Sequence, residues 1–109
     1  MAWTASASGT QTATINTEHT LTSPTAVGTY VFSVDNESVM ALGDTLILRA
    51  YKKIDATNFA PLFEFTYQHV QATSVIFPAI SLASSFGLSF TLQQTAGTGR
   101  AYPWLVEVI

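Results

Sequence analysis

The segments FEFTYQH, residues 63–69, and LSFTLQ, residues 88–93, decide the fold class of this chain. In both segments large apolar side chains alternate with polar ones, and a period of two residues places the two kinds on opposite faces of a β-strand. One face of each strand is therefore expected to lie in a hydrophobic core. The side chains predicted to be buried are Phe63, Phe65, Leu88, Phe90 and Leu92.

Strand patterns of the same kind recur along the chain and end at Gly, Pro, Asn, Asp or Ser. Further strands are expected at residues 18–22, 29–34, 45–54, 75–80 and 104–109. Pro78 favours an edge position for its strand, because proline has no N–H to donate to a neighbour. Residues 96–99, AGTG, are expected to form the turn of a β-hairpin.

No window predicts a long helix, although residues 35–44 are expected to contain one helical turn with Asn36 as its N-cap. About seven to eight strands are enough for two packed antiparallel sheets. The length of 109 residues fits one domain. We therefore predict an all-β fold for residues 1–109, an antiparallel β-sandwich for which the jelly roll is one arrangement.

Residues 1–15 are rich in Thr, Ser and Ala and, apart from Met1, contain Trp3 and Ile15 as their only large apolar side chains. The segment is expected to be either an extended arm or an edge strand. As an arm, residues 1–12 would be dispensable for folding and would help to bind a partner. Trp3 would then be an anchor on that partner, whereas in a strand it would contact distant parts of the chain.

Charged residues make up only 10% of the chain, compared with about a quarter in an ordinary soluble domain. Charge keeps a free monomer soluble and protects exposed sheet edges from pairing. A chain with so little charge is therefore expected to form a homo-oligomer or a larger assembly. The net charge is −3 and the cations are Arg49, Lys52, Lys53 and Arg100. These are too few to neutralise a run of phosphates, so we expect no nucleic-acid binding.

The chain has no cysteine, so disulfides and thiolate metal sites are excluded. Residues 1–15 have neither the cationic start nor the long apolar run of a signal peptide or a membrane span. We therefore expect synthesis in the cytoplasm and no contact with a membrane.

No motif in the chain predicts an enzyme. Glu18 lies beside His19, and Glu64 lies five residues before His69, but neither pair has the spacing of a metal or acid–base site. Residues 97–100, GTGR, lack the pattern of a phosphate-binding loop. We therefore expect no catalytic residues, no cofactor and no metal.

The aromatic side chains support two interpretations, a surface that stacks on sugars and ordinary core packing. Most of them share their strand register with other apolar residues, which favours the core. The six residues concerned are Trp3, Tyr30, Tyr51, Tyr67, Tyr102 and Trp104.

Residues 40–45 and 48–53, MALGDT and LRAYKK, and residues 92–104, LQQTAGTGRAYPW, resemble small structural proteins of tailed bacteriophages. The segment EHTL at residues 18–21 fits the same layout. The chain is similar to the auxiliary capsid proteins, also called cement or decoration proteins, which are encoded among the head genes. This resemblance implies a β-sandwich on the outside of the virion that clamps neighbouring subunits of the major capsid protein. It implies a homo-oligomer, with a trimer favoured, and no catalytic residues.

Three residues are expected to bind a partner. Trp3 has no local core around it, Arg100 has a planar guanidinium that pairs well with carboxylates, and Tyr102 lies in the stretch with the sharpest resemblance. Two other functions stay open, a glycan-binding module and a head-completion or tail component of the virion.

Overall fold

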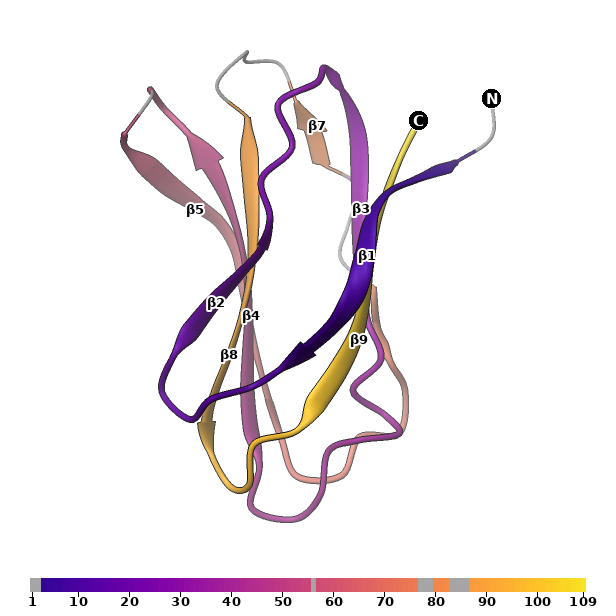
Figure 1. Ribbon diagram of the computed structural model, residues 1–109, viewed down its shortest axis with the longest axis vertical. Coiled ribbons are helices and arrows are strands. Elements are labelled where there is room, and N and C mark those ends of the chain that lie inside the picture. Colours follow the sequence, from indigo (N-terminus) through magenta and orange to yellow (C-terminus); the bar gives the residue numbers. More distant parts are fainter. Residues whose placement is uncertain (1–2, 56, 77–79, 83–86) are drawn as a thin grey trace.

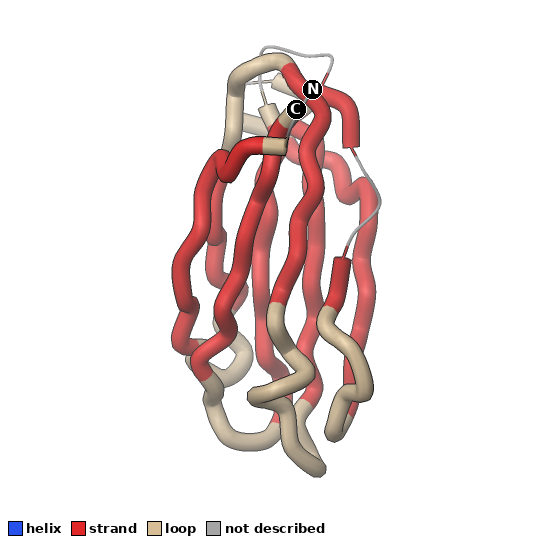
Figure 2. The backbone as a smooth tube through the Cα atoms, turned by 90° about the vertical axis from the view of Figure 1, so that its right-hand side faces the viewer, coloured by secondary structure: helices blue, strands red, loops and turns tan. Residues whose placement is uncertain are grey.

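The chain folds into two antiparallel β-sheets that pack face to face, as predicted (Figures 1 and 2). This computed structural model describes residues 3–55, 57–76, 80–82 and 87–109. Sheet 1 contains, in order, β1 (Thr4–Thr12), β9 (Ala101–Val108) and β3 (Gly28–Val34), with β6 (Val75–Ile76) and β7 (Ile80–Leu82) both paired to β3. Sheet 2 contains, in order, β2 (Glu18–Thr22), β8 (Leu88–Ala96), β4 (Thr45–Lys53) and β5 (Phe59–Gln68).

The strand pairings are nested from the middle of the chain outward. Strand β4 pairs with β5, β3 pairs with β6 and β7, β2 pairs with β8, and β1 pairs with β9. Such a double-stranded ribbon wound into two sheets is a jelly roll. Its consequence is that β1 and β9, at the two ends of the chain, are neighbours, as Figure 1 shows.

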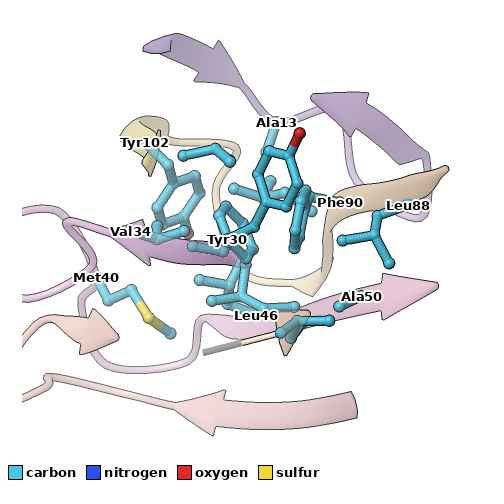
Figure 3. Packing of buried hydrophobic residues seen from close by; sticks show 14 residues of the cluster. Ala13, Tyr30, Val34, Met40, Leu46, Ala50, Leu88, Phe90 and Tyr102 are labelled. Atoms are coloured by element: carbon cyan, nitrogen blue, oxygen red, sulfur yellow. The ribbon is translucent and has the colours of Figure 1, made fainter. Parts of the chain in front are cut away.

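The core lies between the sheets and is built from the alternating apolar residues that predicted the strands (Figure 3). At its centre Phe32 of β3 and Phe90 of β8 join the two sheets, with ring centroids 5.1 Å apart. Both side chains are fully buried. The other apolar strand residues with 1% exposure or less, among those that the structure describes, are Tyr30, Val34, Leu46, Leu48, Ala50, Leu88, Leu92, Tyr102 and Val106.

The N-terminal segment is an edge strand rather than a free arm. Strand β1 pairs with β9 from Thr4↔Val108 to Thr12↔Ala101. The ring of Trp104 lies against Gly9, where an added Cβ would come within 3.4 Å of it. Residues 4–12 therefore form part of sheet 1.

The prediction of a β-hairpin at residues 96–99 is wrong. Strand β8 belongs to sheet 2 and β9 belongs to sheet 1, so this segment crosses from one sheet to the other. A Gly-rich turn looks the same in the sequence whether the strands that it joins pair or separate.

The prediction that Phe65 is a core residue is also wrong, since 37% of its surface is exposed, whereas Phe63 is half-buried against the core. Both side chains lie on β5, which is an edge strand of sheet 2. An edge strand has a bonded neighbour on one side only and is less fully covered by the opposite sheet. The predicted effect of Pro78 lies outside the described residues.

The connection at residues 35–44 contains a single helical turn, in which the Met40 N–H donates to the Asn36 carbonyl over 3.1 Å. Asn36 is not its N-cap. Its side-chain nitrogen and oxygen are buried and have no hydrogen-bond partner among the described residues. Asp35 takes this role instead, because its carboxylate accepts from the Ser38 hydroxyl over 2.9 Å and from the Ser38 N–H over 3.4 Å.

Candidate functional site

Of the three residues predicted to bind a partner, Arg100 and Tyr102 lie close together, whereas Trp3 lies apart from them. Trp3 is 42% exposed directly before β1, so it is accessible at the end of the sandwich that carries both termini (Figure 1). Tyr102 is fully buried, so the structure does not offer its side chain to a partner. Arg100 is partly exposed and forms an ion pair with Asp44 over 2.9 Å, so its charge is used within the chain.

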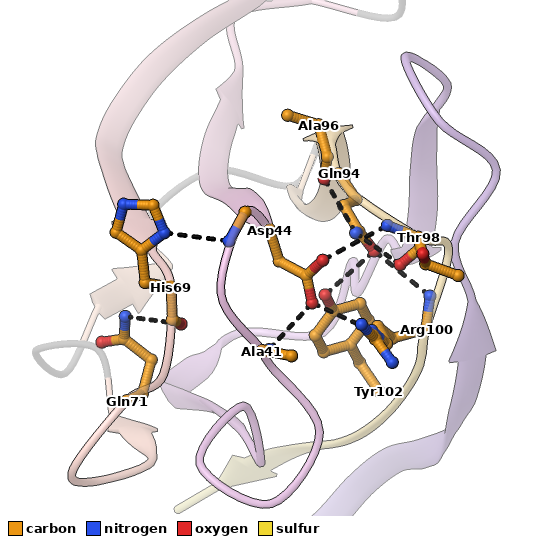
Figure 4. Close-up of polar contacts among 10 residues, drawn as sticks. Ala41, Asp44, His69, Gln71, Gln94, Ala96, Thr98, Arg100 and Tyr102 are labelled. Atoms are coloured by element: carbon orange, nitrogen blue, oxygen red, sulfur yellow. Dashed lines mark hydrogen bonds and ion pairs between the residues drawn. The ribbon is translucent and has the colours of Figure 1, made fainter.

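Asp44 is the centre of a polar cluster at the opposite end of the sandwich (Figure 4). Its carboxylate is 1% exposed and accepts from the Ala41 N–H over 2.9 Å, the Arg100 Nε over 2.9 Å and the Thr98 N–H over 3.3 Å. Burial alone would raise the pKa of Asp44, but these hydrogen bonds and the charge of Arg100 outweigh it and lower the pKa. Asp44 is therefore ionised at neutral pH.

Gln94 extends this cluster into the core. It is fully buried, and its Nε2 donates to the carbonyls of Ala96 and Thr98 over 2.9 and 2.7 Å. Its Oε1 accepts from the Tyr102 hydroxyl over 3.0 Å and the Arg100 N–H over 3.2 Å. Burial, together with the charge of Asp44, raises the pKa of Tyr102 to about 12, so this phenol remains a donor at neutral pH.

The cluster is architectural, since its polar groups bind one another and the backbone. It ties the β3–β4 connection, through Asp44, to the β8–β9 connection, through Thr98 and Arg100. The burial of Tyr102 had a signal in the sequence, because it shares the register of Trp104 and Val106 on β9.

Gly97 is required where these two connections meet. Its φ is +88°, and an added Cβ would collide with Asp44. Gly43 is a matched control, because its φ is +95° but an added Cβ would meet nothing within 4 Å.

We expect Gly43→Ala to lower the free energy of unfolding by about 1 kcal/mol through backbone strain alone. Gly97→Ala is expected to lower it by about 2 kcal/mol or more, as measured by urea unfolding. Equal losses in the two variants would contradict a close approach at Gly97.

Both histidines accept hydrogen bonds from the backbone. His19 Nε2 accepts from the Thr14 N–H over 3.1 Å, and His69 Nδ1 accepts from the Gly43 N–H over 3.0 Å. In the described part of the chain, no group of three or more His, Cys, Asp or Glu side chains is placed to hold a metal ion.

The two sheets differ in charge. The strands of sheet 1 carry one charged residue, Glu107, as far as the structure describes them. The strands of sheet 2 carry five, which are Glu18, Arg49, Lys52, Lys53 and Glu64. The outer face of sheet 1 is formed mainly by small neutral and apolar side chains, among them Thr10, Pro103, Leu105 and Ser33, and Glu107, opposite Val31, is the one charged side chain that the described strands place on it. This face is the best candidate for a protein interface, because charge is depleted at the centre of such interfaces.

A hollow of about 310 Å³ lies on this face. It is lined by residues of β3 and of the strands on either side of it, β9 and β6. Ile76, Pro103 and Leu105 contribute to its apolar lining, together with parts of Val34 and Trp104. Ile76 is 73% exposed. Asp35 and Ser74 also line the hollow, but its surface is largely apolar and would receive an apolar anchor from a partner.

The edge of sheet 1 that β1 forms has little protection against strand pairing, apart from a register shift between Ala5 and Ala7. Strand β1 is nine residues long and contains neither a charged residue nor a proline. Sheet 2 has two edge strands, and each contains a charged residue: β2 contains Glu18, and β5 contains Glu64 as well as Pro61. Strand β1 therefore offers free backbone groups to an added strand.

Comparisons of the chain with protein-family models, with curated proteins and with solved structures find no match. In the described residues there is no helix long and apolar enough to cross a membrane.

Proposed function

We propose that the chain is a non-enzymatic structural protein of a phage virion, a cement or decoration protein. It would bind the outside of the capsid and stabilise contacts between subunits of the major capsid protein. The observation that carries this proposal is the outer face of sheet 1, which has a single charged strand residue, a largely apolar hollow and the edge strand β1. The jelly roll fits this role, since it is frequent in viral capsid proteins, but it also occurs in lectins and does not define a function.

The attachment would combine two modes of binding. An apolar side chain of the capsid protein would enter the hollow beside Leu105, and an extended segment would pair with β1. Trp3, exposed directly before β1, would extend the contact. Attachment at several points on one lattice would multiply a modest affinity, which suits the trimer that the resemblance favours.

The copy number of the chain in purified virions tests this role. Quantitative mass spectrometry against the most abundant shell protein is expected to give a ratio near one or near a simple fraction of one, as closed symmetry requires of a lattice component. A few copies per virion would instead favour a head-completion or tail component. Absence of the chain from virions would contradict the proposal.

The binding surface is tested by adding charge to it. Ile76→Asp and Leu105→Asp are each expected to weaken binding to capsids assembled without the chain by about tenfold or more. Val70→Asp is the matched control, because Val70 is 69% exposed but lies outside the strands of sheet 1. Co-sedimentation of the folded variants with capsids measures the effect. Equal binding by all three variants would exclude this face.

A further inference from the structure

A second cavity, of about 320 Å³, lies on the outer face of sheet 2. Its floor is formed by Ser89 and Thr91 of β8, which are 3% and 4% exposed. Glu18 and Thr20 of β2 form one wall. The opposite wall is aromatic and comes from β4 and β5. Four strands therefore build a hollow that has hydroxyl groups below, a carboxylate on one side and rings on the other.

The aromatic wall consists of Tyr51 and Phe59. Their rings meet edge to face, with centroids 6.1 Å apart and an interplanar angle of 71°. Phe59 is 48% exposed, and the ammonium group of Lys53 lies 5.4 Å from the centre of its ring. These contacts hold an exposed ring in a fixed orientation, and the negative face of a ring attracts C–H groups.

The carboxylate of Glu18 is oriented by the groups around it. Its Oε2 accepts from the Thr91 hydroxyl over 2.6 Å and the Tyr51 hydroxyl over 2.7 Å, and it lies 3.4 Å from Arg49. Burial raises the pKa of Glu18, but these hydrogen bonds and the charge of Arg49 outweigh it, so the pKa lies below its usual value. No described residue donates a hydrogen bond to Oε1, which remains as an acceptor for a ligand hydroxyl.

The charges beside the cavity balance one another. Arg49 also donates to Glu64 over 2.9 Å, so Arg49 and Lys53 offset the two carboxylates of Glu18 and Glu64. A charged ligand would gain little from such surroundings. A neutral ligand with several hydroxyl groups and an apolar face matches them, because it can bond to the fixed polar groups while its C–H groups contact the rings.

We propose that this cavity binds one neutral sugar residue, with its C–H face against Phe59 and Tyr51 and its hydroxyl groups toward Glu18, Ser89 and Thr91. The cavity volume lies at the lower end of the range for small-molecule sites, which fits a single ring. This site lies on the other sheet from the proposed capsid-binding face, so it does not depend on that proposal. A capsid protein with such a site would present a sugar-binding surface to the surroundings of the virion.

Two measurements on the full chain test the site. The labelled chain is first applied to an array of neutral, sialylated and sulfated glycans, on which we expect binding to neutral glycans. The terminal sugar of the strongest binder is then titrated into the wild-type chain and followed by amide NMR. Saturable shifts are expected at Tyr51, Phe59, Ser89 and Thr91. The proposal is overturned if the chain binds no glycan on the array, binds only anionic glycans, or shows its shifts away from these residues.

A matched pair of variants tests the aromatic wall. Phe59→Leu keeps apolar bulk but removes the ring, and it is expected to weaken binding of the sugar identified on the array by about tenfold. Phe65→Leu makes the same change on the same strand, at a residue that pairs with Leu48 on the inner face of sheet 2. It is expected to leave the sugar affinity unchanged. Equal affinities of Phe59→Leu and the wild type would overturn the assignment of this wall.

Ile76→Asp separates this inference from the proposed function. Ile76 lies on sheet 1, so this variant is expected to bind the sugar like the wild type while losing capsid attachment. Loss of sugar binding by folded Ile76→Asp would contradict two separate sites.

Discussion

Phe90→Ala is expected to lower the free energy of unfolding by about 3–5 kcal/mol. Phe90 is fully buried as the third residue of β8, and its ring meets Phe32 of the opposite sheet with centroids 5.1 Å apart. Alanine removes the ring and leaves a cavity between the sheets that the neighbouring strands cannot close without losing their register. Because a domain of this size is stable by about 5–15 kcal/mol, the loss is a large fraction of the total. Urea unfolding followed by circular dichroism measures it.

The same substitution at an exposed phenylalanine is the control for Phe90. Phe59 is 48% exposed, so Phe59→Ala is expected to cost about 1 kcal/mol or less. If Phe90→Ala cost no more than this control, the two sheets would not meet at Phe90.

The core could be predicted from the sequence because it follows a local rule. Alternation with a period of two residues identified the buried face of β8, and Leu88, Phe90 and Leu92 are all exposed by 1% or less. Phe65 has the same local pattern but is 37% exposed. Its exposure depends on the edge position of β5 and on what the opposite sheet places over it. Both are results of long-range pairing.

The sites depend on pairing even more strongly. Glu18, Tyr51, Phe59 and Thr91 form one cavity although they are far apart in the chain, because β2, β8, β4 and β5 are neighbours in one sheet. No spacing within the sequence encodes this arrangement. Arg100 was singled out for its chemistry, but its carboxylate partner proved to be Asp44 within the chain.

Asp44→Ala is expected to lower the free energy of unfolding by about 3 kcal/mol at neutral pH. The substitution leaves the N–H groups of Ala41 and Thr98 without their acceptor and removes the partner of Arg100. These bonds hold together the β3–β4 and β8–β9 connections, and each of these connections links the two sheets. Asp44→Asn retains one acceptor oxygen, so a smaller loss is expected. Thermal and urea unfolding of both variants measure the effect.

The dependence on pH identifies the charge of Asp44 as the cause. Its pKa is lowered in the folded state, so the ionised carboxylate stabilises the fold fully above the unfolded pKa of about 3.9. That contribution is lost as the pH falls through the lower pKa of the folded state. The asparagine of the Asp44→Asn variant cannot titrate. The difference in the free energy of unfolding between the wild type and this variant should therefore be largest above about pH 5 and shrink below about pH 4. A difference that stays constant from neutral pH to acid would show that Asp44 acts through shape rather than charge.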